Sequence, residues 1–234
     1  MKKIGLLIFI AALIAGIVLA NTLSTKKSTG EIFKISINRG VTGSGNIVSE
    51  KRDLADFSAI DASGIVQVEA TAGKDFSVEV EADDNLLALV KTEVSGGVLQ
   101  LGTEKGISTK NSILVRITAP SIESLEVSGA SNVSLDNVSN ENLQIDSSGA
   151  SKVSVAGTAA NLIIDASGAS KIDAENLHSE NVAVDASGAS GVRVSAANEL
   201  KAEASGASNV AYAGNPKNLI KKTSGASSVR QKQL

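Results

Sequence analysis

The stretch LIIDASGASKIDAENLHSEN, from Leu162 to Asn181, contains the tetrapeptide SGAS, which recurs through the second half of the chain. Its six copies begin 18 to 20 residues apart, at Ser128, Ser148, Ser167, Ser187, Ser205 and Ser224. A fixed period of this length is typical of a solenoid, in which each repeat packs against its neighbours. The repeats therefore decide the fold class.

Apolar residues recur at fixed positions on both sides of each tetrapeptide, such as Leu162 and Ile164 before Ser167. The alternation predicts two short strands joined by a tight corner and followed by a polar loop. Successive side chains of a strand point to opposite faces, so Ile164 is expected to point inward and Ile163 outward. The predicted loops end in Asn142, Asn161, Asn181, Glu199 and Asn218.

One such unit cannot bury its apolar side alone, but copies stacked at a strand spacing of about 4.8 Å would form a continuous core. We therefore predict an all-β fold, a single-stranded parallel β-helix with coils of about 19 residues. The glycine would supply the backbone freedom that a sharp corner needs, and the serines could hydrogen-bond the turn. The alternative is a sandwich of hairpins. It is disfavoured because identical corners recur at every second strand and no Asn-Gly or Asp-Gly turn occurs among the repeats.

Residues 43–120 lack the full tetrapeptide but contain a relative of it, IDASGIVQV, from Ile60 to Val68. We expect this half to form degenerate, longer coils that continue into the six SGAS coils of residues 121–230. A short tail follows at residues 231–234. Residues 21–42 are expected to form a linker and a lead-in strand.

The N-terminus has the pattern of an export signal. Lys2 and Lys3 precede an uncharged run over residues 4–20, which ends in Val18-Leu19-Ala20. This pattern predicts that residues 1–20 are a signal peptide cleaved after Ala20. The alternative is an uncleaved membrane anchor, since seventeen helical residues span about 25 Å of a ~30 Å hydrocarbon core. Both predict export to the periplasm, outer envelope or cell surface, with membrane contact only through residues 4–20.

Composition excludes several classes of function. The net charge is −3, and no basic patch is interleaved with aromatic residues, so a nucleic-acid partner is not expected. The chain has no cysteine to ligate a soft metal. Its single histidine, His178, lies in no recognisable motif, and no G-x-S-x-G sequence supplies a nucleophile. We therefore expect no cofactor and no catalytic residue.

A column of acidic residues precedes the corners by two positions and ends at Lys222 in the sixth copy. Stacked carboxylates about 5 Å apart repel by roughly 1 kcal/mol per pair in water, and a hard cation such as Ca²⁺ would relieve this repulsion. The alternative is a solvated face that limits association between edges, with Lys152 and Lys171 offsetting part of the charge. The candidates for a cation site are Glu126, Asp146, Asp165, Asp185 and Glu203.

Three segments together resemble a known family. They are GSGNIVSEKRDLADFSAIDASGIVQVEA at residues 43–70, VEVEADDNLLALVKTEV at residues 78–94 and the run of SGAS repeats. The chain from about Gly43 to Arg230 resembles the putative auto-transporter adhesin, head GIN domain family of bacterial envelope proteins. The resemblance implies an exported, right-handed parallel β-helix, and it supplies no catalytic residue.

Two classes of function remain. The first is a non-catalytic envelope or cell-surface protein, an adhesin-like or scaffold module that presents Ser, Ala and acidic faces to glycans or envelope proteins. The second is a carbohydrate-active enzyme on the same scaffold, similar to polysaccharide lyases or hydrolases. Such an enzyme needs long loops as groove walls, and repeats of 18 to 20 residues leave little room for them. We therefore expect the chain not to be an enzyme.

Overall fold

The computed structural model describes residues 40–103 and 106–232. The predicted leader at residues 1–20 and nearly all of the predicted linker lie outside these ranges. Within them, no helix has the length and apolar character needed to cross a membrane.

The regular structure of the described residues consists of strands and one short 3-10 helix, η1 (Leu87–Leu89). The strands are β1 (Val41–Thr42), β2 (Ile47–Arg52), β3 (Ala59–Ala62), β4 (Val66–Ala72), β5 (Ser77–Asp83), β6 (Val90–Ser95), β7 (Val98–Thr103), β8 (Ile107–Ser108), β9 (Ile113–Ala119), β10 (Ser124–Val127), β11 (Asn132–Ser147), β12 (Lys152–Ala166), β13 (Lys171–Ala186), β14 (Gly191–Ala204), β15 (Asn209–Ala213), β16 (Asn218–Thr223) and β17 (Ser228–Gln231).

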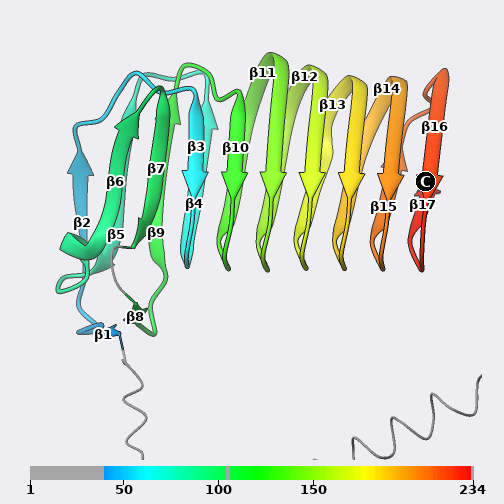
Figure 1. Ribbon diagram of the computed structural model, residues 1–234. Coiled ribbons are helices and arrows are strands. Elements are labelled where there is room, and N and C mark those ends of the chain that lie inside the picture. Colours follow the sequence, from blue (N-terminus) through cyan, green and yellow to red (C-terminus); the bar gives the residue numbers. More distant parts are fainter. Residues whose placement is uncertain (1–39, 104–105, 233–234) are drawn as a thin grey trace, which may run out of the picture. The chain divides into compact units, whose positions relative to one another are not determined.

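The repeats form a parallel β-solenoid, as the sequence predicts (Figure 1). Strands β11 to β14 each bend and run through two walls of the stack, and each pairs with the next coil in parallel. We call these the first wall and the second wall, and define each by the strands that form it. The first wall is β6-β7-β3-β10, the second halves of β11 to β14, and β16. The second wall is β2-β5-β9-β4, the first halves of β11 to β14, β15 and β17.

The core consists of apolar columns that cross the coils in register. Ile164 pairs with Ile145 on one side and Val184 on the other, and its side chain is 0% exposed, whereas Ile163 is 48% exposed. The predicted inward and outward faces are confirmed. The column passes through Ala202 and ends in Lys221, whose Nζ lies 4.7 Å from the centre of the buried Tyr212 ring. A cation over an aromatic face thus covers the last layer of the core.

The SGAS corners are held by backbone contacts from coil to coil. Gly168 has φ +70° and Gly188 has φ +72°, a conformation that glycine adopts without steric cost. A Cβ on Gly168 would lie 2.6 Å from the carbonyl oxygen of Gly149 in the previous coil. That same oxygen accepts a hydrogen bond from the amide of Ala169 at 2.7 Å. The corner therefore requires glycine for both its conformation and its packing.

In three of the six copies the hydroxyl of the last serine of the tetrapeptide closes the turn. Ser190 and Ser208 donate hydrogen bonds to the carbonyl oxygens of Ser187 and Ser205, at 2.9 and 2.8 Å. A hydroxyl three residues beyond a carbonyl can make such a bond without disturbing the strands. At these corners the bond fulfils the hydrogen-bonding role expected for the serines. Ser151 instead bonds the Ser147 hydroxyl at 2.7 Å, and the Oγ atoms of Ser131 and Ser170 have no partner in the structure.

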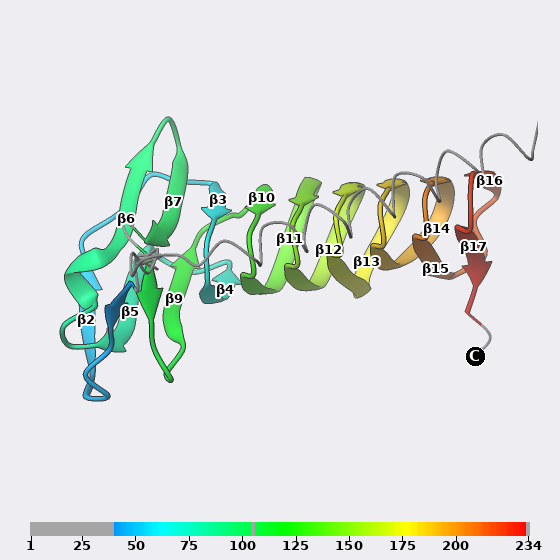
Figure 2. The same cartoon turned by 60° about the horizontal axis from the view of Figure 1, so that its bottom comes forward.

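Residues 43–120 depart from the expected longer coils in two ways. First, the stacking order differs from the chain order: β7 and β9 lie outside β3 and β4, and β10 stacks on β3 (Figure 2). Second, β2, β5 and β6 run antiparallel to their partners. For β6 and β7 the reason is local, because the two-residue Gly96-Gly97 turn has positive φ at both positions. Such turns connect antiparallel strands.

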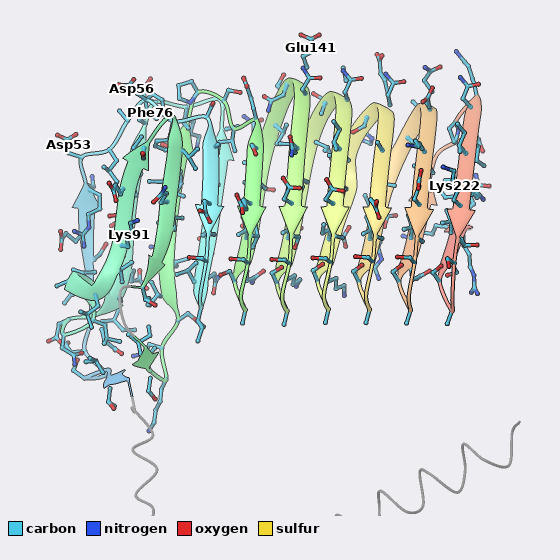
Figure 3. All side chains as sticks on the ribbon, viewed as in Figure 1. Asp53, Asp56, Phe76, Lys91, Glu141 and Lys222 are labelled. Carbon is cyan, nitrogen blue, oxygen red and sulfur yellow. The ribbon has the colours of Figure 1, made fainter. Side chains whose placement is uncertain are left out.

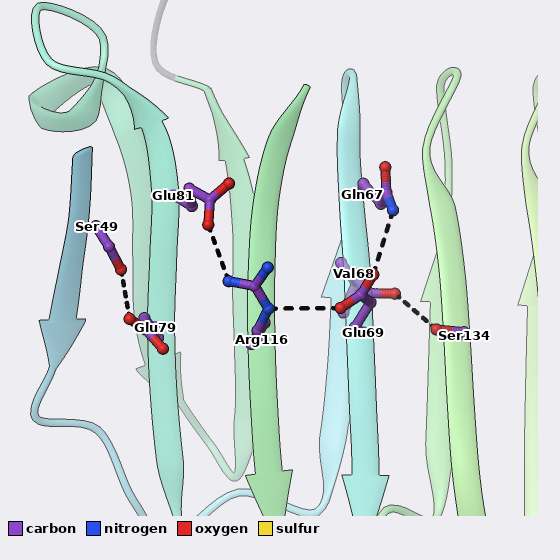
Figure 4. A network of polar contacts seen from close by, with 8 residues as sticks. All are labelled: Ser49, Gln67, Val68, Glu69, Glu79, Glu81, Arg116 and Ser134. Carbon is purple, nitrogen blue, oxygen red and sulfur yellow. Dashed lines mark hydrogen bonds and ion pairs between the residues drawn. The ribbon is translucent and has the colours of Figure 1, made fainter. Parts of the chain in front are cut away.

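Side chains tie the antiparallel strands to the coils on the outer face of the second wall (Figure 4). Arg116 on β9 binds Glu81 on β5 at 3.0 Å and Glu69 on β4 at 3.5 Å. Ser49 on β2 hydrogen-bonds Glu79 on β5. These contacts join four neighbouring strands across the boundary between the two kinds of pairing.

Candidate functional site

The five predicted acidic residues form one row across the first wall. Strand pairing aligns Glu126, Asp146, Asp165, Asp185 and Glu203 in that order. The row continues beyond Glu126 to Asp61 of β3 at one end, and beyond Glu203 to Lys222 of β16 at the other. We call the six carboxylates from Asp61 to Glu203 the acidic ladder. Neighbouring rungs belong to adjacent strands, which lie about 4.8 Å apart.

Asp61 was not among the residues predicted for this row. The signal was present, since IDASG occurs at residues 60–64 and again at residues 164–168. The strand pairing of β3 with β10 was needed to place it, because β3 precedes β10 by more than sixty residues in the chain.

The middle of the ladder borders a shallow, open hollow of about 590 Å³. Carboxylates of the ladder and serines at or next to the corners line it. Its polar lining consists of Glu126, Asp146, Asp165, Asp185, Ser147, Ser148, Ser167, Ser187 and Ser205. Carboxylate oxygens accept hydrogen bonds, and serine hydroxyls both donate and accept them. The hollow therefore offers a dense, regular set of polar partners to a ligand.

The rungs differ in electrostatics, a difference that the sequence alone does not reveal. Burial raises the pKa of Asp165, and the neighbouring charges of Asp146 and Asp185 raise it further. At the far end, hydrogen bonds from Lys222 and Lys201, at nitrogen–oxygen distances of 3.0 and 3.3 Å, lower the pKa of Glu203. The ladder is thus neutralised at one end and strongly anionic in its middle.

Lys152 and Lys171 do not offset the charge of the ladder. Both lie on the second wall, beyond the corner, where they pair with each other in register. Among residues 40–103 and 106–232, no lysine or arginine forms an ion pair with Glu126, Asp146, Asp165 or Asp185. Gln144 does donate a hydrogen bond to Asp146, at 2.9 Å.

The straight row does not assemble a closed metal centre. In the described part of the chain, no three His, Cys, Asp or Glu side chains are grouped so as to hold a metal ion. A cation on the ladder would lie between two rungs and keep most of its water ligands. The five cation candidates are therefore brought together, and their binding of a cation stays a prediction.

His178 lies on strand β13 and not in a loop, next to Thr158 and Ser195 of the adjacent coils. Its side chain is exposed. No carboxylate or hydroxyl is hydrogen-bonded to it in the described residues, as a nucleophile and its base would require.

A second hollow, of about 570 Å³, lies where β8 approaches the first coils. It is lined by Ile65, which is 63% exposed, together with Ile107, Lys110 and Asn132. Ile65 occupies the corner position that alanine fills in the SGAS coils, because Gly64 accepts the amide hydrogen bond of Ala130. The sequence analysis missed this hollow, although an isoleucine at a corner was a visible departure from the repeat.

Several solved structures share this fold. A putative adhesin from Bacteroides fragilis is 21% identical over 82% of this chain and 100% of its own, with a TM-score of 0.69. A putative lipid binding protein from Parabacteroides distasonis is 17% identical over 82% and 99% of the two chains, with a TM-score of 0.54. A putative adhesin from Parabacteroides merdae is 18% identical over the same shares, with a TM-score of 0.51. At these identities the likeness concerns the fold alone.

No curated protein matches this chain. A family model does, over residues 56–216, which is more than half of the sequence and includes β3, the two hairpin strands β6 and β7, and the first five SGAS corners. The chain belongs to the family described as putative auto-transporter adhesin, head GIN domain.

Proposed function

We propose that this protein is a non-catalytic, adhesin-like binding module of the bacterial envelope, and that the acidic ladder binds extended glycans with Ca²⁺ as a bridge. The observation that carries the proposal is the unbroken row of carboxylates flanked by serine hydroxyls on an open wall. Sugar hydroxyls can donate to the carboxylates, and a cation bound between rungs can coordinate further hydroxyl oxygens.

The flatness of the wall favours a polymer over a small substrate. Strands β11 to β14 have 14 to 16 residues each and are joined by the short corners, so no loop between these strands overhangs the ladder. Catalytic sites usually exclude water within a cleft. An open row of equivalent sites instead suits many weak contacts with a repeating ligand, whose combined avidity exceeds that of each contact.

Export of the chain is a further part of the proposal. It is supported by the predicted leader at residues 1–20 and by the likeness to adhesins. Mass spectrometry of the envelope fraction should find a chain that begins at Asn21. An intact Met1 terminus in salt-resistant membranes would instead identify residues 4–20 as an anchor.

A glycan array probed with the exported chain, with Ca²⁺ or with a chelator, tests the binding role. The combined variant Asp146→Asn, Asp165→Asn and Asp185→Asn should abolish binding, because it removes the charge and keeps the size of each rung. Glu141→Gln is the control, since Glu141 is an exposed carboxylate at the end of its coil (Figure 3) that belongs neither to the ladder nor to the lining of the hollow. Binding that persists in the ladder variant would overturn the proposal.

A carbohydrate-active enzyme on the same wall is the second candidate, and one observation favours it. A carboxyl with a raised pKa beside ionised carboxylates, as Asp165 is, resembles the general acid of glycoside hydrolysis. Incubating each bound glycan with the protein and measuring released reducing ends decides between the two. Turnover that disappears in Asp165→Asn would establish the enzyme.

A further inference from the structure

Gly191, a glycine of the repeat region, lies in a strand and not at a corner. Gly191 stands in an outward-facing column on the second wall, in register with polar residues of every neighbouring SGAS coil. The other members of this column are Asn132, Lys152, Lys171, Asn209 and Ser228.

Neither backbone nor packing requires a glycine at this position. Its φ is not in the left-handed region, and a Cβ built on it would have no neighbour within 4 Å. At Gly188, by contrast, a Cβ would lie 2.5 Å from the carbonyl oxygen of Gly168. Glycine weakens a strand interior, and one that the fold does not need often marks a place where a ligand approaches.

The missing side chain leaves a hollow of about 300 Å³, which we call the Gly191 notch. Small side chains surround it at Ala169, Ala189 and Ala211, and its polar lining is Ser170, Lys171, Arg193 and Asn209. Its volume lies at the lower end of the range for ligand pockets, so it suits a single ring and not a chain.

The notch is cationic, in contrast to the ladder. Lys171 forms no ion pair within residues 40–103 and 106–232, and Arg193 binds Asp173 through one nitrogen at 3.0 Å. The guanidinium keeps further N–H donors for a ligand. Lys152 in the coil before and Arg230 two coils beyond Arg193 add positive charge to the same wall.

We propose that the Gly191 notch binds one acidic sugar residue, with the carboxylate held by Lys171 and Arg193 and a ring hydroxyl by Asn209. Lysine and arginine form strong charge-assisted hydrogen bonds with carboxylates. This site does not depend on the ladder, which lies on the other wall and carries the opposite charge.

The test is to titrate the whole exported chain separately with D-glucuronate, D-glucose and inorganic phosphate. Binding is monitored in each titration by the NMR chemical shifts of the backbone amides. Glucuronate should shift the amides around residue 191 saturably, and glucose should not. Gly191→Leu places a side chain in the notch from a Cβ position that is free of contacts within 4 Å, and Lys171→Ala removes the unpaired lysine of the notch. Each should weaken glucuronate binding by about tenfold or more, the effect of one lost charge-assisted contact.

Lys152→Ala is the matched control, because Lys152 holds the same column position one coil earlier and does not line the notch. It should bind glucuronate as the unaltered chain does. Equal weakening by all three substitutions, or no saturable shift, would overturn the proposal. Phosphate binding as tight as that of glucuronate would overturn the assignment to a sugar. The ladder variant should leave this titration unchanged, so the two proposals can fail separately.

Discussion

The head of the molecule, β1 to β9, and the SGAS coils, β10 to β17, bury similar apolar residues in different ways. The head uses distinct contacts: the rings of Phe57 and Phe76 pack at 5.1 Å, and Asp83, 2% exposed, accepts hydrogen bonds from Thr109 and Asn111. The coils repeat one corner along a line, and each copy fits because its neighbour is the same. A defect should therefore be local in the head and should disrupt neighbouring coils in the repeats.

The largest effect is expected when a corner glycine is replaced. Gly168→Ala combines left-handed strain with a collision against the Gly149 carbonyl oxygen, and should lower the free energy of unfolding by about 3–6 kcal/mol. In the head, Gly96 has φ +60° but open space around a Cβ, so Gly96→Ala should cost only about 1 kcal/mol. Urea denaturation of both variants measures the difference. Equal losses would mean that the coil contact contributes nothing.

The next effect separates the two faces of a coil. Ile164→Ala should cost about 2–5 kcal/mol, the usual range for truncating a buried isoleucine. Ile163→Thr, on the neighbouring exposed residue, should cost well under about 1 kcal/mol. The same urea measurement checks this pair, and a larger loss at Ile163 would contradict the register.

Acidification should act on the two regions in opposite directions. In the head, hydrogen bonds from Thr109 and Asn111 lower the pKa of Asp83, so its stabilising contribution is present above about pH 3.9 and is lost as the pH falls through the lowered value. In the coils, the raised pKa of Asp165 means that protonation on falling from neutral pH adds stability.

Urea midpoints from pH 7 to pH 2 therefore should rise slightly and then fall. Asp165→Asn should remove the rise, and Asp83→Asn should reduce the fall. If Asp165→Asn instead changed the fall at low pH and Asp83→Asn changed the rise, these two carboxyls would not govern the pH dependence.

The smallest effect concerns the last coil. Lys221→Ala removes the cation over Tyr212 and should lower the free energy of unfolding by about 0.5–1 kcal/mol. Lys217→Ala, an exposed lysine of the same coil outside that contact, is the control and should change little. Thermal unfolding compares the two, and identical melting temperatures would rule out a capping role.

The periodic part of the fold could be predicted from the sequence because its contacts are copies of one local pattern. The inward column of Ile164 and the alignment of Glu126 to Glu203 follow from spacing alone. The head could not be derived in this way, since its pairings join segments that share no pattern. The Gly96-Gly97 hairpin was the one local sign of its antiparallel strands. The raised pKa of Asp165 likewise depends on its two spatial neighbours and on burial, which only the assembled stack provides.

The stacking order of the head determines the side on which the SGAS coils are added. The pairings within residues up to Ala119 place β7 and β9 against one side of β3 and β4, with β6, β5 and β2 beyond them. The opposite edges of β3 and β4 are the edges that β10 and β11 occupy in parallel. Each coil that follows then finds a single template behind it. As the chain emerges from its N-terminus onward, a set of nearly identical repeats can therefore assemble in chain order, although their sequences alone would not distinguish one coil from the next.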